Sequence, residues 1–300
     1  DGLTFIMKAL NIGKGDTVIC PANSFIASAW SIIAAGAEPI FCDVEDNMLI
    51  SVKEIEKVIK PSTKAIMAVH LTGKLCDVNS ISKFCEEKNL YFLEDSAQAV
   101  GAFDSNNKKA GSFGIASSFS LHPLKNLSIY GDGGVITTNN SSIFEKTCLL
   151  RNHGLRNRDQ SKIWGFNSRL DEIQAAFALV KLRHIEDFTE KYISIANLYT
   201  ENLSSSIIKP KLSKKQRDVF HNYIVRVMPK HRDKIMFALQ ELGVDTKIHY
   251  PIPLHLQECS KNLGYKNGDI PKVEKLSKSM ISLPIFPFLQ EKEIEYIIEK

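Results

Sequence analysis

The sequence predicts an α/β protein with a largely parallel sheet, followed by a smaller α+β domain. Over the first half of the chain, short apolar runs alternate with stretches of helical length, a pattern typical of parallel strands joined by crossover helices. A long helical pattern then interrupts the alternation, and shorter strand and helix patterns follow it. The length of 300 residues suits one large domain with a smaller one attached.

Six runs rich in β-branched and apolar residues predict buried strands in the large domain. These runs are Thr17–Cys20, Pro39–Val44, Ala65–His70, Leu90–Glu94, Ala116–Ser120 and Val135–Thr138. Amphipathic helices are predicted between several of them, at Phe25–Ala35, Val52–Ile59 and Val78–Lys88. Because strand and helix alternate, the sheet is expected to be mostly parallel, with ligand sites at the carboxyl ends of its strands.

An apolar helical face predicts one long helix from Asn167 to about Leu203, which links the two domains. The side chains of this face are Ile173, Ala176, Phe177, Val180, Leu182 and Ile185. We therefore divide the chain into a large domain of residues 1–185 and a small C-terminal α+β domain of residues 186–300 with the linking helix. The further elements predicted are a strand at Asn222–Met228, a helix at His231–Leu242, a strand at Thr246–His249 and a helix at Glu291–Glu299.

Composition argues against a membrane or nucleic-acid-binding protein. Hydrophobic residues make up 44% of the chain, and no apolar run approaches the roughly 18 residues of a membrane span. The net charge of +4 is small and the basic residues are scattered, so no nucleic-acid partner is predicted. The six cysteines form no CxxC pair, which favours a reducing cytoplasm, and no metal site is predicted.

The chain opens at Asp1, without a methionine, in a stretch that already has a helical pattern. We therefore expect that the N-terminal part of the large domain precedes it.

Asp95 ends an apolar strand within the segment Leu93–Ala99, and ligands bind at strand ends in open α/β sheets. A carboxylate in this position can pair with a pyridinium nitrogen and keep it protonated, which strengthens the ring as an electron sink. Taken alone, an aspartate at a strand end is more often the N-cap of the next helix.

The segment Ser117–Leu127 delivers Ser120 and then Lys125 into a loop, and the glycine-rich run Gly131–Gly134 follows it. A lysine in an apolar or cationic pocket loses its proton readily and becomes nucleophilic towards an aldehyde. An isolated loop lysine is usually an exposed surface residue. A strand-end carboxylate, a hydroxyl suited to phosphate and a loop lysine on one sheet together indicate a phosphorylated ring cofactor.

With these residues the chain resembles the DegT/DnrJ/EryC1/StrS family of nucleotide-sugar aminotransferases, which use pyridoxal phosphate. The resemblance covers nearly the whole chain. Its motifs are Asn11–Asp16, Glu94–Gln98, His122–Leu127, Arg151–Gly154, Gly165–Asp171, His249–Pro251 and Ser282–Pro287. It implies an aspartate-aminotransferase-like large domain of fold type I, with the small domain at the C-terminus.

The resemblance also implies roles for the residues that hold the cofactor. Lys125 forms the Schiff base and shuttles the proton, Asp95 holds the pyridine nitrogen, and Gln98 hydrogen-bonds the ring oxygen. Phe25 matches the aromatic that stacks on the ring, although a phenylalanine at a helix start also serves as core. Ser120 matches a residue that binds the phosphate.

Further residues match the substrate side and a second subunit. Asn167 matches a residue that reaches the phosphate from the neighbouring subunit, so a homodimer with a shared active site is implied. His153, His249 and Tyr250 are candidates for substrate binding, although each could serve as an ordinary structural residue. Family members carry a Gly-Thr pair just before the position of Asp1 that helps to cradle the phosphate, and the present sequence lacks it.

The function predicted is a ping-pong transamination in which glutamate donates an amino group that is then transferred to a nucleotide-linked keto-sugar. The segments Arg151–Leu155 and Asn157–Asp159 are similar to those of members that aminate deoxy-keto-sugars at the 3-position. Three alternatives stay open. A sugar dehydratase of the same fold is expected to carry histidine in place of Lys125. A nucleotide-dependent oxidoreductase is expected to show a GxGxxG motif after a strand, which this chain lacks. The third is a non-catalytic regulator that binds a sugar nucleotide.

Overall fold

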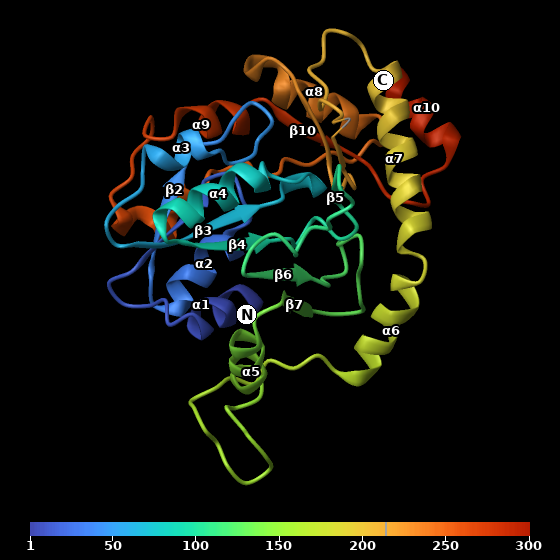
Figure 1. Ribbon diagram of the computed structural model, residues 1–300. Helices are drawn as coiled ribbons and strands as arrows, with labels where there is room; N and C mark the ends of the chain where they lie inside the picture. Colours follow the sequence, from blue (N-terminus) through green and yellow to red (C-terminus); the bar gives the residue numbers. More distant parts are fainter. Residues whose placement is uncertain (214) are drawn as a thin grey trace.

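A six-stranded sheet forms the centre of the molecule in the computed structural model, which describes residues 1–213 and 215–300 (Figure 1). The strand order is β2-β1-β3-β4-β6-β7. The strands are β1 (Thr17–Pro21), β2 (Glu38–Cys42), β3 (Thr63–Val69), β4 (Tyr91–Asp95), β6 (Ala116–Ser120) and β7 (Gly134–Thr138). All neighbours pair in parallel except β7, which is antiparallel to β6. The α/β class and the mostly parallel sheet are therefore confirmed.

Helices cover both faces of this sheet because alternate side chains of each strand point in opposite directions. Cys20 and Met67 pack on one face with residues of α1, α2 and α5, whereas Ile19 and Ile66 pack on the other with α3 and α4. The helices are α1 (Gly2–Ala9), α2 (Ile26–Ala35), α3 (Val52–Glu56), α4 (Val78–Lys88) and α5 (Ser141–Leu150). With both faces buried, the carboxyl edge of the sheet is the part left to bind a ligand.

The C-terminal region has a separate core in which helices pack on a two-stranded antiparallel sheet of β9 and β10. Tyr199, Tyr223 and Ile281 are buried at its centre. The helices and strands after residue 170 include α6 (Glu172–Leu182), α7 (Ile185–Asn202), β9 (Tyr223–Arg226), α8 (Pro229–Glu241), α9 (Pro271–Ser277), β10 (Met280–Leu283) and α10 (Glu291–Glu299), of which α6 and α9 contribute no residue to this core cluster. A short antiparallel pair, β5 (Phe103–Asp104) with β8 (Gln216–Arg217), joins this region to the first.

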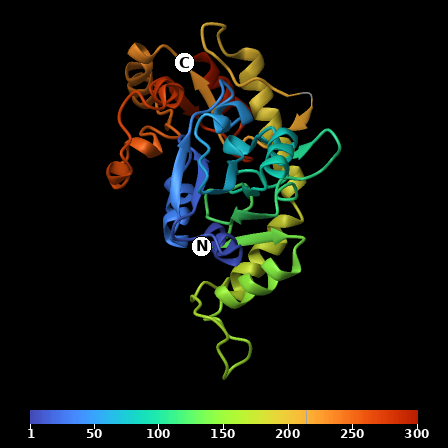
Figure 2. The ribbon, with the colours of Figure 1, turned by 60° about the vertical axis from the view of Figure 1, so that its left-hand side comes forward.

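The segment around α9 packs against the first sheet rather than against β9 and β10. Leu254 and Val273 belong to the core cluster that contains Met67, and the carboxylate of Asp43 accepts hydrogen bonds from the backbone N–H groups of Lys272 and Val273, both 3.0 Å long. Figures 1 and 2 both place α9 beside the β2 end of the sheet. Part of the C-terminal segment therefore packs with the first core, and the division at residues 185 and 186 stays a prediction.

Two predicted elements were wrong. The long helix from Asn167 is two helices, because α6 begins after its N-cap Asp171 and ends at Leu182, and His184 has φ −108° and ψ 5°, outside the α-helical region. The strand predicted at Thr246–His249 is a single bridge in which Lys247 and Ser282 exchange two backbone hydrogen bonds. Pro251 and Pro253, which lack N–H groups, follow directly, and the ladder is not continued.

The other predicted elements are confirmed to within a few residues, the largest difference being the helix at Val52–Ile59, which ends at Glu56. Among the residues that the structure describes, no helix is both long and apolar enough to cross a membrane.

Candidate active site

The site lies where the adjacent parallel strands β4 and β6 end. Asp95 is the last residue of β4 and Ser120 the last of β6, and the two strands pair with Asp95 opposite Ser118. Lys125 follows β6 in the loop towards β7. Parallel strands end at the same edge of a sheet, so the Asp95 carboxylate and the loop that carries the Lys125 amine both lie at this edge.

The carboxylate of Asp95 is buried and held by two hydrogen bonds. Its Oδ2 atom accepts from the Ser28 hydroxyl at 2.6 Å, and Oδ1 accepts from the backbone N–H of Ala97 at 3.2 Å. The hydroxyl of Ser28 lies 2.7 Å from that of Ser24, which precedes the N-cap of α2. Ser28 was not among the predicted site residues. The only signal in the sequence was a pair of serines four residues apart, one just before a predicted helix and one in its first turn.

Gln98 connects three segments around this carboxylate. Its side-chain oxygen accepts from the backbone N–H of Thr72 at 2.6 Å, and its side-chain nitrogen donates to the Tyr250 hydroxyl at 3.2 Å. The ring of Tyr250 lies 5.8 Å from the ring of Phe25, which is 54% exposed. Burial, with the charge of Asp95 as a smaller contribution, raises the pKa of Tyr250 to about 12, so this hydroxyl stays protonated near neutral pH.

Lys125 lies in an environment that favours its neutral amine. Burial lowers the pKa of its ammonium group, while the negative charge of Asp95 acts in the opposite direction. The following residue, Asn126, fixes the loop, because its side-chain nitrogen donates to the carbonyl of Val219 at 3.0 Å. The Asn126 side-chain oxygen lies 3.0 Å from Nδ1 of His221.

Two histidines accompany the lysine. Burial and then the charge of Lys125 lower the pKa of His249, and the same two causes bring the pKa of His221 well below its usual value. Nδ1 of His249 lies 2.8 Å from the Ser282 hydroxyl. Neither His221 nor Asn126 was among the predicted site residues. The position of Asn126 next to the lysine was a signal in the sequence. No such signal pointed to His221, because its contact with Asn126 joins residues that are far apart in the chain.

Three predicted residues do not join this cluster within one chain. The hydroxyl of Ser120 accepts a hydrogen bond from the His122 backbone N–H at 3.2 Å, within its own loop. Asn167 forms an isolated bridge with Asn152, and His153 is exposed next to it. Both lie in the connection between α5 and α6, which projects from the body of the molecule in both views (Figures 1 and 2).

The fold places an amine and a carboxylate at one edge of an α/β sheet, and comparisons with known proteins identify the class of enzyme. The model of the DegT/DnrJ/EryC1/StrS aminotransferase family matches residues 1–300. The dTDP-3-amino-3,6-dideoxy-alpha-D-galactopyranose transaminase of Aneurinibacillus thermoaerophilus is 40% identical, with 100% of this chain and 82% of that protein covered. A pleiotropic regulatory protein of Geobacillus stearothermophilus is also 40% identical, with 100% and 81% covered.

Solved structures agree with this match. The crystal structure of S. venezuelae DesV in complex with a ketimine intermediate has a TM-score of 0.96 at 33% identity, and the alignment covers 100% of this chain and 81% of DesV. The PLP form of a putative sugar aminotransferase from Streptococcus pneumoniae has a TM-score of 0.93 at 27% identity, covering 99% of this chain and 83% of that one. The chain belongs to the DegT/DnrJ/EryC1/StrS aminotransferase family and is a pyridoxal-phosphate-dependent aminotransferase.

The donor set at the sheet edge fits this cofactor. A pyridine nitrogen needs a buried acceptor such as Asp95, an aldehyde needs a primary amine that is easily deprotonated such as Lys125, and a flat ring needs an exposed aromatic such as Phe25. When bound, pyridoxal phosphate supplies an electron-withdrawing ring that stabilises negative charge on the substrate carbon.

Proposed function

We propose that this aminotransferase takes an amino group from L-glutamate and transfers it by a ping-pong reaction to a nucleotide-linked keto-deoxy-sugar, at C3 of the sugar. The observation that carries the proposal is the placement of Asp95 at the end of β4 and of Lys125 in the loop after the adjacent strand β6. The sugar class is supported by the transaminase from A. thermoaerophilus, whose name specifies a dTDP-linked 3-amino-sugar. Glutamate and C3 are carried over from the family resemblance of the sequence.

In this proposal each residue of the cluster has one task. Lys125 holds the cofactor and, once released, carries a proton between two carbons of the reacting group, for which its lowered pKa is suitable. Asp95, fixed by Ser28, keeps the ring nitrogen protonated. Phe25 stacks on the ring, and Gln98 donates to the ring oxygen.

The phosphate and the sugar are assigned to residues around this cluster. The hydroxyl of Ser120 binds the phosphate, together with Asn167 of a second copy. His153, His249 and Tyr250 bind the substrate. The hydroxyl of Tyr250 already contacts Gln98, which supports a position between cofactor and substrate.

A homodimer completes the site in this proposal. None of the residues of α6 is buried, and among them the apolar side chains of Ile173 and Leu179 are 67% and 60% exposed. An apolar helix face without cover indicates a protein partner, and a second copy also supplies the Asn167 that the cluster lacks. The six cysteines are free, which supports the proposed location in a reducing cytoplasm.

The test is to incubate the protein with L-glutamate and a panel of nucleotide-linked keto-deoxy-sugars that differ in the position of the keto group. We expect 2-oxoglutarate to form, and mass spectrometry to detect an amino-sugar nucleotide with the 3-keto compound. Lys125→Ala is expected to lower turnover by roughly 10²–10⁴-fold or more. Full activity of this variant would rule out the assignment of Lys125, and amination at another carbon would rule out C3.

The non-catalytic alternative, a regulator that binds a sugar nucleotide without turnover, fits the name of the G. stearothermophilus relative but is disfavoured by the aminotransferase class of this chain. The same assay separates the two, since a regulator binds the sugar nucleotide but forms no 2-oxoglutarate. The dehydratase alternative is disfavoured because Lys125 is present where a histidine is expected.

A further inference from the structure

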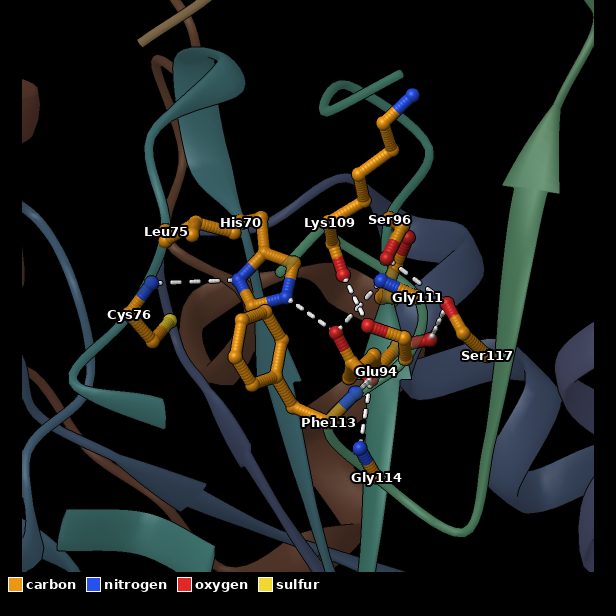
Figure 3. Close-up of polar contacts among 12 residues, drawn as sticks. His70, Leu75, Cys76, Glu94, Ser96, Lys109, Gly111, Phe113, Gly114 and Ser117 are labelled. Carbon is orange, nitrogen blue, oxygen red and sulfur yellow. Dashed lines mark hydrogen bonds and ion pairs between the residues drawn. The ribbon is translucent and has the colours of Figure 1, made fainter. Parts of the chain in front are cut away.

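A histidine and a glutamate form a fully buried pair directly behind the proposed cofactor contacts. Nε2 of His70 lies 2.9 Å from Oε2 of Glu94, and both residues are 0% exposed (Figure 3). His70 follows β3, and Glu94 precedes Asp95 in β4. Successive strand residues point to opposite faces, so the Glu94 side chain lies on the face away from the Asp95 carboxylate.

The carboxylate of Glu94 organises the loop that leads into β6. Oε1 accepts the backbone N–H groups of Phe113 and Gly114 at 2.8 and 2.7 Å, and Oε2 accepts that of Gly111 at 2.8 Å, as Figure 3 shows. Burial alone raises the pKa of Glu94, but the hydrogen bonds from His70 and from the loop hold it below its usual range. Each oxygen thus has two donors, which is the arrangement of an ionised carboxylate.

The hydrogen bonds of His70 fix its tautomer. Its Nδ1 atom accepts the backbone N–H of Cys76 at 3.2 Å, so Nδ1 carries no proton and Nε2 donates to Glu94. Burial lowers the pKa of His70, but the hydrogen bonds with Cys76 and Glu94 outweigh burial and raise that pKa to about 10. The backbone N–H directed at Nδ1 nevertheless leaves no place for a second ring proton, so the geometry indicates a neutral imidazole in a single orientation.

The same histidine contacts the cofactor-facing residues through its backbone and the turn that follows it. The His70 N–H donates to the Asp95 carbonyl at 3.1 Å. Two residues later, the Thr72 N–H donates to the side chain of Gln98 at 2.6 Å, and Thr72 has φ 62°, a left-handed conformation that the surrounding contacts must hold in place. A shift of His70 therefore displaces the partners of both Asp95 and Gln98.

We propose that His70 and Glu94 are positioning residues that set the orientation of Asp95 and Gln98 towards the cofactor. The proposal rests on the cofactor contacts assigned to those two residues and not on the identity of the sugar. Its readout is cofactor binding, so a wrong sugar assignment leaves the outcome unchanged.

The chain contains a matched control in a second buried histidine–glutamate pair. Nε2 of His255 lies 3.0 Å from Glu274, which accepts the backbone N–H groups of Gly268 and Ile270, and His255 is 1% exposed. This pair organises the loop before α9. If both pairs only stabilise the fold, changing either histidine should alter stability without a specific effect on cofactor binding. If the His70 pair positions Asp95 and Gln98, changing His70 alone should weaken cofactor binding.

The experiment compares His70→Gln with His255→Gln. The glutamine amide can take the place of Nε2 and donate to glutamate, but its oxygen does not lie where Nδ1 stands. His70→Gln therefore also removes the acceptor of the Cys76 N–H, whereas Nδ1 of His255 has no partner among the described residues. We expect both variants to unfold at lower temperature without cofactor. Only His70→Gln is expected to raise the dissociation constant of pyridoxal phosphate, by about tenfold, and to shift the pH midpoint of the bound cofactor's absorbance.

A His70→Gln protein that is less stable but binds the cofactor with wild-type affinity and midpoint would overturn the proposal. If this variant does not fold, histidine NMR of the wild-type protein decides. The Nε2–H signal of His70 is expected to move when pyridoxal phosphate is added while that of His255 stays, and a stationary His70 signal contradicts the proposal.

Discussion

At the scale of single residues, Ser28 makes the shortest hydrogen bond to the carboxylate of Asp95, at 2.6 Å. Hydrogen bonds to charged groups are stronger than neutral ones, so removing this donor loosens and destabilises the ionised carboxylate. We expect Ser28→Ala to raise the dissociation constant of pyridoxal phosphate about tenfold. Absorbance titration of the cofactor measures it.

Ser31→Ala is the control for this prediction, because Ser31 lies on the same helix and its hydroxyl donates to the backbone carbonyl of Ser28 instead. It removes one buried hydroxyl from α2 without touching Asp95. Equal losses of affinity in the two variants would show that the effect comes from the helix and not from the carboxylate.

The environment of Lys125 leads to a prediction about pH. Burial lowers the pKa of Lys125 by more than the negative charge of Asp95 raises it. Lys125 is therefore expected to lose its proton at a lower pH than the exposed lysines of the cofactor-free protein. Asp95→Asn removes the negative charge, so the midpoint is expected to fall further. NMR titration of isotope-labelled lysine side chains measures both values, with Lys125→Ala to assign the signal. A higher midpoint in Asp95→Asn would contradict the electrostatic argument.

The sequence could identify Asp95 and Lys125 because the first ends a strand and the second lies in the loop after one, each in a recognisable segment. It could not identify Ser28, because the contact with Asp95 depends on how α2 packs beside β4. His70 and Glu94 were hidden for a related reason: a histidine and a glutamate at the ends of two apolar strands are informative only once β3 and β4 are known to be neighbours.

At the scale of secondary structure elements, α6 touches its own chain, as where the ring of Phe177 lies 4.9 Å from that of Tyr130, but none of its residues is buried by the part of the chain that the structure describes. If a second copy covers it, a charge at Leu179 must be buried in the interface at high cost. Leu179→Asp is therefore expected to raise the dimer dissociation constant at least about tenfold, measured by sedimentation velocity over a range of concentrations.

Phe237→Asp provides the matched control, since Phe237 is 65% exposed on α8. It is expected to leave the oligomeric state unchanged, and circular dichroism should show both variants folded. A Leu179→Asp protein that sediments as the wild type does, or a Phe237→Asp protein that dissociates to the same extent, would locate the interface elsewhere.

The strands of the large sheet were predictable because both faces of the sheet are buried, which gives continuous apolar runs. The break between α6 and α7 was not, because the apolar pattern continues from Val180 through Ile185 and neither glycine nor proline marks the interruption. The return of α9 to the first sheet depends on distant contacts such as that of the Tyr265 hydroxyl with the backbone N–H of Phe41. Local patterns carry no information about such contacts.

At the scale of the whole molecule, one series of hydrogen bonds links the two halves of the site. The Asp95 carbonyl accepts from His70 at 3.1 Å, the His70 carbonyl from Gly73 at 3.2 Å, and the Gly73 carbonyl from Val219 at 3.0 Å. The Val219 carbonyl in turn accepts from Asn126, the residue after the lysine. The segment that leads into β9 thus braces both the carboxylate and the lysine loop.

The proposed sharing of the site between two subunits can be tested by mixing two inactive variants. If Lys125 acts in its own subunit and Asn167 in its partner's, a heterodimer of Lys125→Ala with Asn167→Ala contains one site that lacks both residues and one that lacks neither. Random exchange of equal amounts makes about half of the dimers mixed, so about a quarter of the sites are expected to regain wild-type structure. The measurement is activity before and after subunit exchange. No recovery, with exchange confirmed by mass spectrometry, would place Asn167 in the site of its own chain or outside the site altogether, and the projecting connection between α5 and α6 would then need another role.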